Sequence, residues 1–374
     1  MSKRRYELDT RVLTIFFFVA MPFVAFGSFL VVSMARSALQ DSLGVSLEQR
    51  AVETRFLIER YVGDQIVHLR LVALDPQIRA ALTTPSKERS REDARRLEQA
   101  WIGADDPKLV AGILRSPLAA RLRTIARVRP ALKLLQVVDA QGRLLAASAR
   151  AGRLLNAETR WFRGVTGEGA ERAYVGDIQR PAGAALPLLE IAYPIYDGEA
   201  RFVGALRALT DATDLYSVIA PVRVGRTGHA LLVRASDGLI LASDEVQRIL
   251  TRPIAGFDIM LSALDERRGF RVIPEVREAA AGGEAVLEPA RLVGFSPVEQ
   301  IPNVDWLVVV EQDLQEAMAP VQELTRYLWT HFIGAFGSVI LLALYLSFKL
   351  ETPVIEEALH LHGERGSSTT SNES

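Results

Sequence analysis

The 374-residue sequence contains no cysteine, which excludes disulfide bonds, thiolate metal sites and cysteine nucleophiles. Its net charge is only −1, because 44 Lys and Arg residues oppose 45 Asp and Glu residues. A neutral balance gives no reason to expect a nucleic-acid partner. The sequence has no GxSxG elbow, HExxH, CxxC or P-loop pattern. We therefore expect no enzyme with a locally recognisable site and no cofactor, and we interpret His360-Leu361-His362 as incidental rather than as a metal site.

Two long uncharged runs account for much of the 49% hydrophobic content. Residues 12–35 carry no charge, and residues 327–348 carry none apart from His331. About 20 apolar helical residues cross a bilayer core, so we predict two transmembrane helices. Basic residues precede the first run, which places residues 1–11 and 349–374 in the cytoplasm and 36–326 outside the inner membrane, in the periplasm or extracellular space. A cleaved signal peptide is the alternative, since Ser33-Met34-Ala35 resembles a cleavage site.

The region after the first run is predicted to be helical. Apolar residues recur at three- or four-residue steps over residues 37–74, which predicts a long helix ending near Asp75-Pro76. Residues 77–130 are rich in Arg, Ala and Leu with several prolines, which predicts short helices. We interpret Asp105-Asp106, before Pro107, as turn or cap residues.

A repeat with a spacing of roughly 100 residues follows. Residues 134–148 predict a hairpin with its turn at 139–142, and residues 230–243 repeat this pattern. Pro194 and Asp211 around a later hairpin correspond to Pro297 and Asp313. We therefore predict an α+β fold with two tandem modules, about 75–222 and about 223–312, each a mixed sheet flanked by helices.

Residues 161–211 hold the densest run of strand, turn and polar residues. The stretches 188–195 and 202–209 predict a hairpin with its turn centred on Gly198 and Glu199. In that register Tyr193 faces Gly204 on an apolar face, and Glu190 stands directly opposite Arg207. Tyr174-Val175-Gly176-Asp177 predicts a short strand, and Trp161-Phe162 a short helix.

This stretch resembles the double Cache family of extracytoplasmic sensor domains, whose modules are PAS-like, found in bacterial chemoreceptors, sensor kinases and cyclic-dinucleotide enzymes. The resemblance rests on Arg160-Trp161-Phe162, residues 174–177, IAYPIYD, the glycine in FVGAL and the helix start DATDL, and with the second module it covers roughly residues 36–326. It implies a tandem sensor ectodomain that binds a small molecule. Members that bind amino acids or amines carry an Arg, a Tyr-x-Asp and an Asp where this sequence has Thr159, residues 174–177 with one extra residue, and Leu209.

Ligand sites join apolar walls to a few convergent polar groups, so the best candidate pocket lies in this first module. Our candidate ligand-binding residues are Trp161, Phe162, Tyr174, Asp177, Tyr193, Arg207 and Asp211. The alternative is structural: the aromatic side chains form core, Asp177 caps a turn, and Glu190 pairs with Arg207 across the strands. Both interpretations remain open on the sequence.

The predicted function is a two-helix inner-membrane sensor of an unidentified small solute. The cytoplasmic stretch 351–359 resembles the opening of a HAMP-type signalling helix, with a disordered tail after it and no output domain. We therefore expect the sensor to act through a separate signalling protein of kinase or chemotaxis type. We also expect a homodimer, because the apolar stripe of the helix over residues 37–74 is longer than one module needs. A membrane-anchored binding or scaffold protein and, third, a cryptic envelope enzyme are the alternatives.

Overall fold

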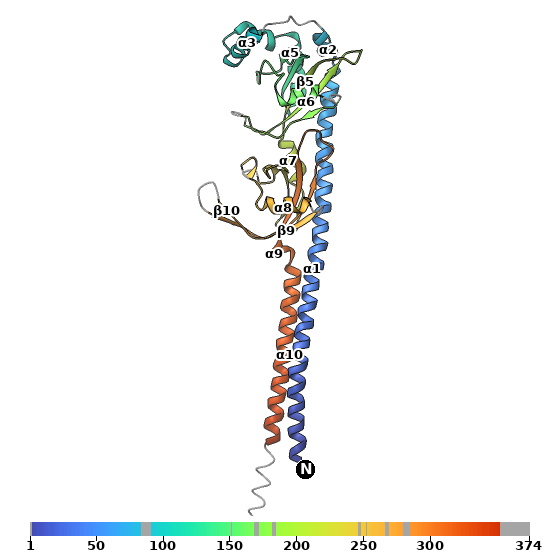
Figure 1. Ribbon diagram of the computed structural model, residues 1–374, viewed down its shortest axis with the longest axis vertical. Coiled ribbons are helices and arrows are strands. Elements are labelled where there is room, and N and C mark those ends of the chain that lie inside the picture. Colours follow the sequence, from blue (N-terminus) through green and yellow to red (C-terminus); the bar gives the residue numbers. More distant parts are fainter. Residues whose placement is uncertain are drawn as a thin grey trace, which may run out of the picture. The chain divides into compact units, whose positions relative to one another are not determined.

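The computed structural model describes residues 2–83, 91–150, 152–167, 172–181, 185–245, 248–251, 253–265, 269–279 and 285–351. The chain divides into two compact units (Figure 1). One unit, here called the helical unit, comprises Met1–Leu39 and Met318–Ser374. The other, the sheet unit, comprises Gln40–Ala317.

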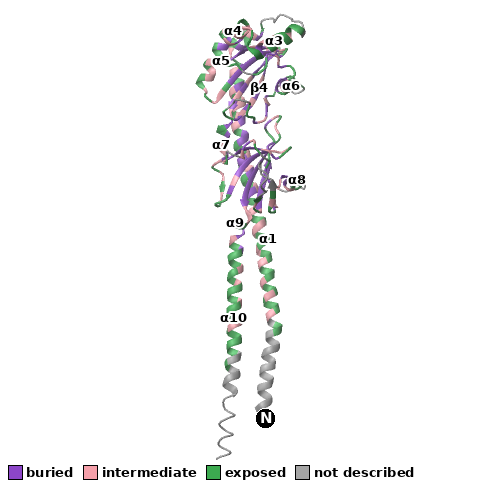
Figure 2. Cartoon of the chain, turned by 90° about the vertical axis from the view of Figure 1, so that its left-hand side faces the viewer, coloured by how far each residue is buried: buried purple, intermediate pink, exposed green. Residues whose placement is uncertain are grey.

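Two long helices provide the described part of the helical unit. Helix α1 runs without interruption over Ser2–Ala73, so that its second half belongs to the sheet unit, and α10 covers Ala319–Glu351. Where burial is described in the helical unit, mainly over 21–39 and 319–342, their side chains are mostly exposed or partly exposed (Figure 2). Among the described residues one helix, over Met21–Ala73, is long and apolar enough to cross a membrane. The predicted second span, 327–348, lies within α10, and the predicted HAMP-like stretch 351–359 falls almost wholly outside the described residues.

Four short helices follow α1, as the spacing of prolines predicted. They are α2 (Pro76–Thr83), α3 (Arg91–Gly103), α4 (Pro107–Leu114) and α5 (Pro117–Val128). The Asp106 carboxylate accepts hydrogen bonds from the Lys108 and Leu109 amides at 2.9 and 3.1 Å, and Pro107 occupies the first helical turn, where no amide donor is needed. The interpretation of Asp106 as a cap residue is confirmed.

The first sheet has the strand order β2-β1-β5-β4-β3. Its strands are β1 (Leu132–Asp139), β2 (Leu144–Ala147), β3 (Tyr174–Val175), β4 (Leu188–Tyr196) and β5 (Phe202–Asp211), with helices α6 (Arg160–Thr166) and α7 (Thr213–Ile219). The second sheet contains β6 (Arg223–Val224), β7 (Gly228–Arg234), β8 (Ile240–Ser243), β9 (Phe270–Ile273), β12 (Arg291–Pro297) and β13 (Trp306–Asp313). Helices α8 (Phe257–Asp265) and α9 (Leu314–Ala317) and the separate hairpin β10 (Val276–Ala279) and β11 (Ala285–Glu288) accompany it.

The two sheets share one strand order, since β8-β7-β13-β12-β9 corresponds to β2-β1-β5-β4-β3. The repeat read from the sequence thus has a topological counterpart. The prediction of mixed sheets was wrong, because every pairing between the described strands is antiparallel. The reason is the long connection between β2 and β3, which carries the chain to the far edge of the sheet before the β4–β5 hairpin returns it antiparallel to β1.

The predicted register of the β4–β5 hairpin was wrong by two residues. Ala192, not Glu190, stands opposite Arg207, and Glu190 stands opposite Leu209. The turn is longer than predicted: the Asp197 amide donates to the Arg201 carbonyl, and the pairing shifts at a bulge near Ile195. Because a shift by two keeps every side chain on its predicted face, Glu190 still reaches Arg207 diagonally.

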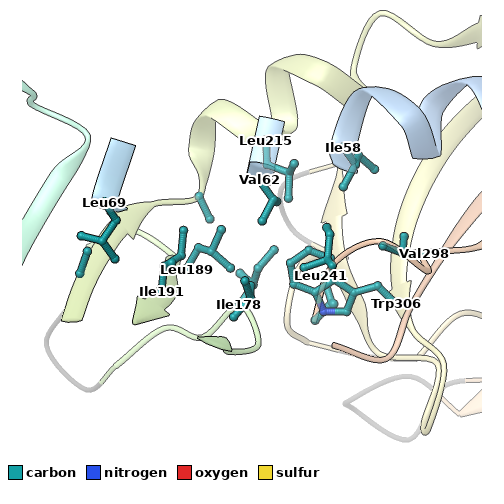
Figure 3. Packing of buried hydrophobic residues seen from close by; sticks show 14 of the residues in the cluster. Ile58, Val62, Leu69, Ile178, Leu189, Ile191, Leu215, Leu241, Val298 and Trp306 are labelled. Carbon is teal, nitrogen blue, oxygen red and sulfur yellow. The ribbon is translucent and has the colours of Figure 1, made fainter. Parts of the chain in front are cut away.

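The core of the sheet unit follows helix α1 along both sheets. One buried cluster joins Ile58 and Val62 of α1 to Ile191 of the first sheet and Leu241 of the second (Figure 3). Helix α1 lies close to the backbone of β12 at Gly294, where an added Cβ atom would lie 2.3 Å from the Glu48 amide nitrogen. Only glycine lets the helix backbone lie this near the strand.

A buried ionic cluster lies in the second sheet around Glu311 of β13. Its carboxylate lies 2.7 Å from Arg291 Nη1, 3.3 Å from His229 Nε2 and 3.9 Å from Arg248 Nη1, and the side chains of Glu311 and Arg291 are 3% and 6% exposed. Burial raises the pKa of Glu311, but His229, Arg291 and Arg248 outweigh burial and bring it below its ordinary value. Burial lowers the pKa of His229, but the Glu311 carboxylate outweighs burial and raises it above 6.5.

These two shifts predict how stability depends on pH. The stabilisation from protonated His229 is fully present below its ordinary pKa of 6.5 and is lost as pH rises through the raised pKa. The stabilisation from ionised Glu311 is present above 4.5 and is lost as pH falls through the lowered pKa. Urea unfolding of the chain at several pH values should therefore give the greatest free energy of unfolding between pH 4.5 and 6.5. His229→Gln should flatten the decline of this free energy on the alkaline side. An unchanged alkaline slope in that variant would refute the assignment.

Candidate ligand site

Arg207 lies at the centre of the first sheet, on the face that α6 covers. On β5 it stands between Gln136 of β1 and Ala192 of β4, which are its partners in register. Because side chains alternate along a strand, Glu190, two residues before Ala192, points to the same face. Three polar side chains from three adjacent strands therefore converge under α6.

The three polar groups bind one another. Arg207 Nε donates to Glu190 Oε1 at 2.6 Å, and Arg207 Nη1 donates to Gln136 Oε1 at 2.7 Å. Gln136 is fully buried, while the side chains of Arg207 and Glu190 are 15% and 16% exposed. The guanidinium carbon lies 5.5 Å from the centroid of the Trp161 ring, within cation–π range. The pair is thus partly desolvated yet reachable from solvent.

Aromatic side chains form the wall beside this pair. Trp161 and Phe162 of α6 are buried, and their rings meet edge to face at 5.6 Å. Tyr174 packs over Gly164, where an added Cβ atom would lie 2.3 Å from the tyrosine ring, so this contact requires glycine. Burial, together with the nearby Glu190 carboxylate, raises the pKa of Tyr174, which therefore stays a neutral donor and acceptor.

Three further residues lie at this site that the sequence pattern did not predict: Trp101, Gln136 and Gly152. Trp101 Nε1 donates to the Gly152 carbonyl at 3.2 Å, and an added Cβ atom at Gly152 would lie 3.1 Å from Arg207 Nη1. Gly152 has φ of 71°, which favours glycine. The register of β1 against β5 would have revealed Gln136, but nothing local to Trp101 or Gly152 indicates their position.

The structure brings together four of the seven candidate residues: Trp161, Phe162, Tyr174 and Arg207. Tyr193 lies on the opposite face of β4 and packs against the core cluster that follows α1. Asp211 ends β5, where it accepts hydrogen bonds from the Thr213 amide at 2.9 Å and hydroxyl at 2.5 Å. Burial raises the pKa of Asp211, but the bonds from Thr213 and Lys133 outweigh burial and lower it, as suits an ionised cap.

Asp177 is directed to the second sheet. Its Oδ2 atom accepts from Arg234 Nε at 2.5 Å, and its Oδ1 atom accepts from the indole Nε1 of Trp306 at 2.9 Å. Trp306 is 1% exposed and lies in the core cluster. Both carboxylate oxygens therefore have partners from the other sheet.

A separate cavity of about 310 Å3 lies between α3, α4 and the start of β2. Its walls are mostly leucine, with Leu97, Leu109, Leu144 and Leu154 among them. Within the described ranges of the chain, no three His, Asp or Glu side chains are grouped so that they could hold a metal ion.

The family model dCache_1, described as a Cache domain, matches residues 88–321, which is more than half of the chain. The chain belongs to the Cache domain family. The resemblance to double Cache sensor domains is therefore confirmed.

Solved structures similar to this Cache chain are ligand-binding domains of chemoreceptors. The domain of Pseudomonas fluorescens CtaA, solved with L-isoleucine, is 17% identical, with 76% of this chain and 98% of that chain covered and a TM-score of 0.43. The ligand-binding domain of Pseudomonas aeruginosa PctB, solved with L-Arg, is 16% identical, with 76% of this chain and 93% of that chain covered and a TM-score of 0.43. The sensory domain of Campylobacter jejuni Tlp3 is 11% identical, with 76% of this chain and 99% of that chain covered and a TM-score of 0.49. A search of the curated protein sequences found no significant match.

Proposed function

We propose that the chain is an extracytoplasmic sensor that binds a small polar solute beside Arg207 and Glu190, under helix α6. The observation that carries this proposal is the convergence of this charged pair with Trp161 and Tyr174 inside a Cache domain. A partly desolvated charged pair beside aromatic walls provides the few oriented polar groups that a small-molecule site needs. The proposed ligand site includes the candidate residues Trp161, Phe162, Tyr174 and Arg207, and also Gln136.

The charges of the pair define the class of solute. Arg207 offers donors to an anionic group, and Glu190 offers an acceptor to an ammonium or hydroxyl group. The ligand would exchange the internal Arg207–Glu190 bonds for its own, so it must present both kinds of group a few ångströms apart. Thr159, whose hydroxyl donates to the Asn156 carbonyl at 2.6 Å, and Leu209 leave the amino-acid pattern of the family incomplete. Small carboxylates with a second donor group are therefore as suitable as amino acids.

A ligand screen on the full chain tests this function. Purified in nanodiscs, the chain should show a raised unfolding temperature with at least one member of a panel of amino acids, amines, carboxylates and purines. Arg207→Gln should weaken binding of that compound about tenfold or more, because a charge-assisted hydrogen bond is lost. Arg201→Gln removes an arginine of the β4–β5 turn whose side chain is 70% exposed, and this variant should bind the compound normally. Equal affinity in both variants would place the site elsewhere.

We further propose that two tandem modules, about 75–222 and about 223–312, stand between two transmembrane helices at 12–35 and 327–348. The repeated strand order and the two uncharged runs support this arrangement. The amino terminus would be cytoplasmic, and the sensor would act on a separate signalling protein.

Helix α1 carries an exposed apolar stripe that supports a homodimer. Val45, Phe56 and Val67 are 54%, 50% and 53% exposed and follow one another at steps of three helical turns, so they share one side of the helix. Cysteines at Val45 and Phe56 should form disulfide-linked dimers in membranes of this cysteine-free chain. Ser46→Cys, about 100° around the helix, is the control. Crosslinking at Ser46 as strong as at Val45 would argue against a specific interface.

A further inference from the structure

Asp177 joins the two sheets through one carboxylate. It follows strand β3 of the first sheet, whereas its partners Arg234 and Trp306 are the last residue of β7 and the first residue of β13. Arg234 and Trp306 are themselves paired in register, so the carboxylate engages two adjacent strands at one end of the second sheet. The Asp177 and Arg234 side chains are 29% and 25% exposed, so both are partly shielded from water.

The neighbours of Asp177 hold it in place. The preceding Gly176 amide donates to the Glu190 carbonyl at 2.8 Å, which ties the segment to β4 beside the candidate site. The following Ile178 is fully buried in the same core cluster as Trp306 (Figure 3). On the other side, Asp237 accepts from Arg234 Nη1 at 2.8 Å. A displacement of Tyr174 or Glu190 would therefore move the Asp177 carboxylate against groups that are fixed in the second sheet.

Strand β13 leads from this contact toward α10. It is the central strand between β7 and β12, and all of its residues but the last are buried. Two residues beyond Leu314, in α9, the Glu316 carboxylate accepts from the Arg226 and Thr227 amides at 2.7 and 2.9 Å. The loop 225–227 thus binds the carboxylate of the segment that precedes α10.

We propose that Asp177 is a positioning residue that couples the candidate ligand site to β13, and through β13 to the segment entering α10. This role rests on the proposed function, and it differs from direct ligand binding. A change at the ligand site that displaces β3 would alter the hydrogen bonds of Asp177 to Arg234 and Trp306, because a packed, hydrogen-bonded strand moves as a unit.

Hydrogen–deuterium exchange on the full chain in nanodiscs tests the coupling without any ligand. Arg207→Gln serves as the perturbation at the site, and peptides covering 228–243 and 303–313 report on the second sheet. In a chain that keeps Asp177, Arg207→Gln should change the exchange rates of these peptides about fivefold or more. In a chain that also carries Asp177→Asn, the change caused by Arg207→Gln should fall below about twofold. Asp237→Asn, which removes the other carboxylate on Arg234 within the second sheet, should preserve the response.

The outcomes separate this proposal from the proposed function. If Asp177→Asn does not fold, Arg234→Lys, which keeps the charge and loses the Nε donor, takes its place and should abolish the response in the same way. An equal response in all backgrounds, or no response in any, would overturn the coupling role. Failure to find a ligand in the screen would count against the sensor function but would leave the exchange result unaffected.

Discussion

Replacing Glu311 with Gln should lower the free energy of unfolding by about 3 to 5 kcal/mol, since removing one partner of a buried ion pair leaves the other charge uncompensated. Arg291 Nη1 lies 2.7 Å from the Glu311 carboxylate, and Arg291 Nη2 donates to the Ala255 carbonyl at 2.8 Å, so the guanidinium cannot turn to solvent. Arg248 and His229 share the same counterion. The variant therefore leaves the permanently cationic Arg291 and Arg248 around a neutral amide.

Urea unfolding of the full chain, followed by circular dichroism, measures this effect. Glu199→Gln is the matched control, because Glu199 pairs with Arg201 at 2.9 Å but its side chain is 73% exposed. Exposed pairs contribute about 0.2 to 1 kcal/mol, so that variant should unfold near the wild-type midpoint. Similar midpoints for both variants would show that the buried cluster is not what stabilises the second sheet.

Replacing Gly294 with Ala should cost about 3 kcal/mol or more, near or beyond the upper end for overpacked sites. An added Cβ atom would lie 2.3 Å from the Glu48 amide nitrogen and from the Leu47 carbonyl carbon, so the obstacle is the backbone of α1 and not a movable side chain. Relief requires the helix to withdraw from β12, which opens the core that includes Leu47.

Gly63→Ala, in helix α1 itself, is expected to have the opposite effect on stability. Nothing lies within 4 Å of a Cβ atom at Gly63. Alanine in a helix interior is favoured over glycine by about 0.5 to 1 kcal/mol, so this variant should be as stable as the wild type or slightly more stable. Calorimetry of both variants checks the prediction, and a Gly294→Ala transition at the wild-type temperature would refute the close packing of α1 on β12.

The sequence predicted those features of the fold that depend on local patterns. Proline and aspartate at 106–107 marked a helix start, and the glycines at 142 and 238, both with positive φ, marked the turns of two equivalent hairpins. Strand direction was missed, because antiparallel pairing of β1 with β5 depends on where a long connection returns the chain. The hairpin register was missed because Ala200 adopts φ of 61°, which lengthens the turn beyond what Gly198 alone suggests.

The candidate site was predicted in part for a similar reason. Trp161, Phe162, Tyr174 and Arg207 share a face because helix and strand positions near one another in sequence also meet in space. Asp177 has a partner 129 residues later, Trp306, and no periodicity within the first module reveals such a contact. The extra residue in Tyr174-Val-Gly-Asp177 was visible in the sequence, yet only the structure shows which strands that carboxylate reaches.

Fluorine NMR of the full chain in nanodiscs, with its four tryptophans fluorinated, tests directly whether a ligand binds beside Trp161 and alters the contact of Asp177 with the second sheet. Trp161 lies at the proposed ligand site and Trp306 at the coupling contact with Asp177, and single Trp→Phe variants assign their signals. A compound from the ligand panel should shift the Trp161 and Trp306 signals together, and Asp177→Asn should abolish the Trp306 shift while the Trp161 shift persists. A bound compound that leaves the Trp161 signal unchanged would show that the ligand does not bind under α6.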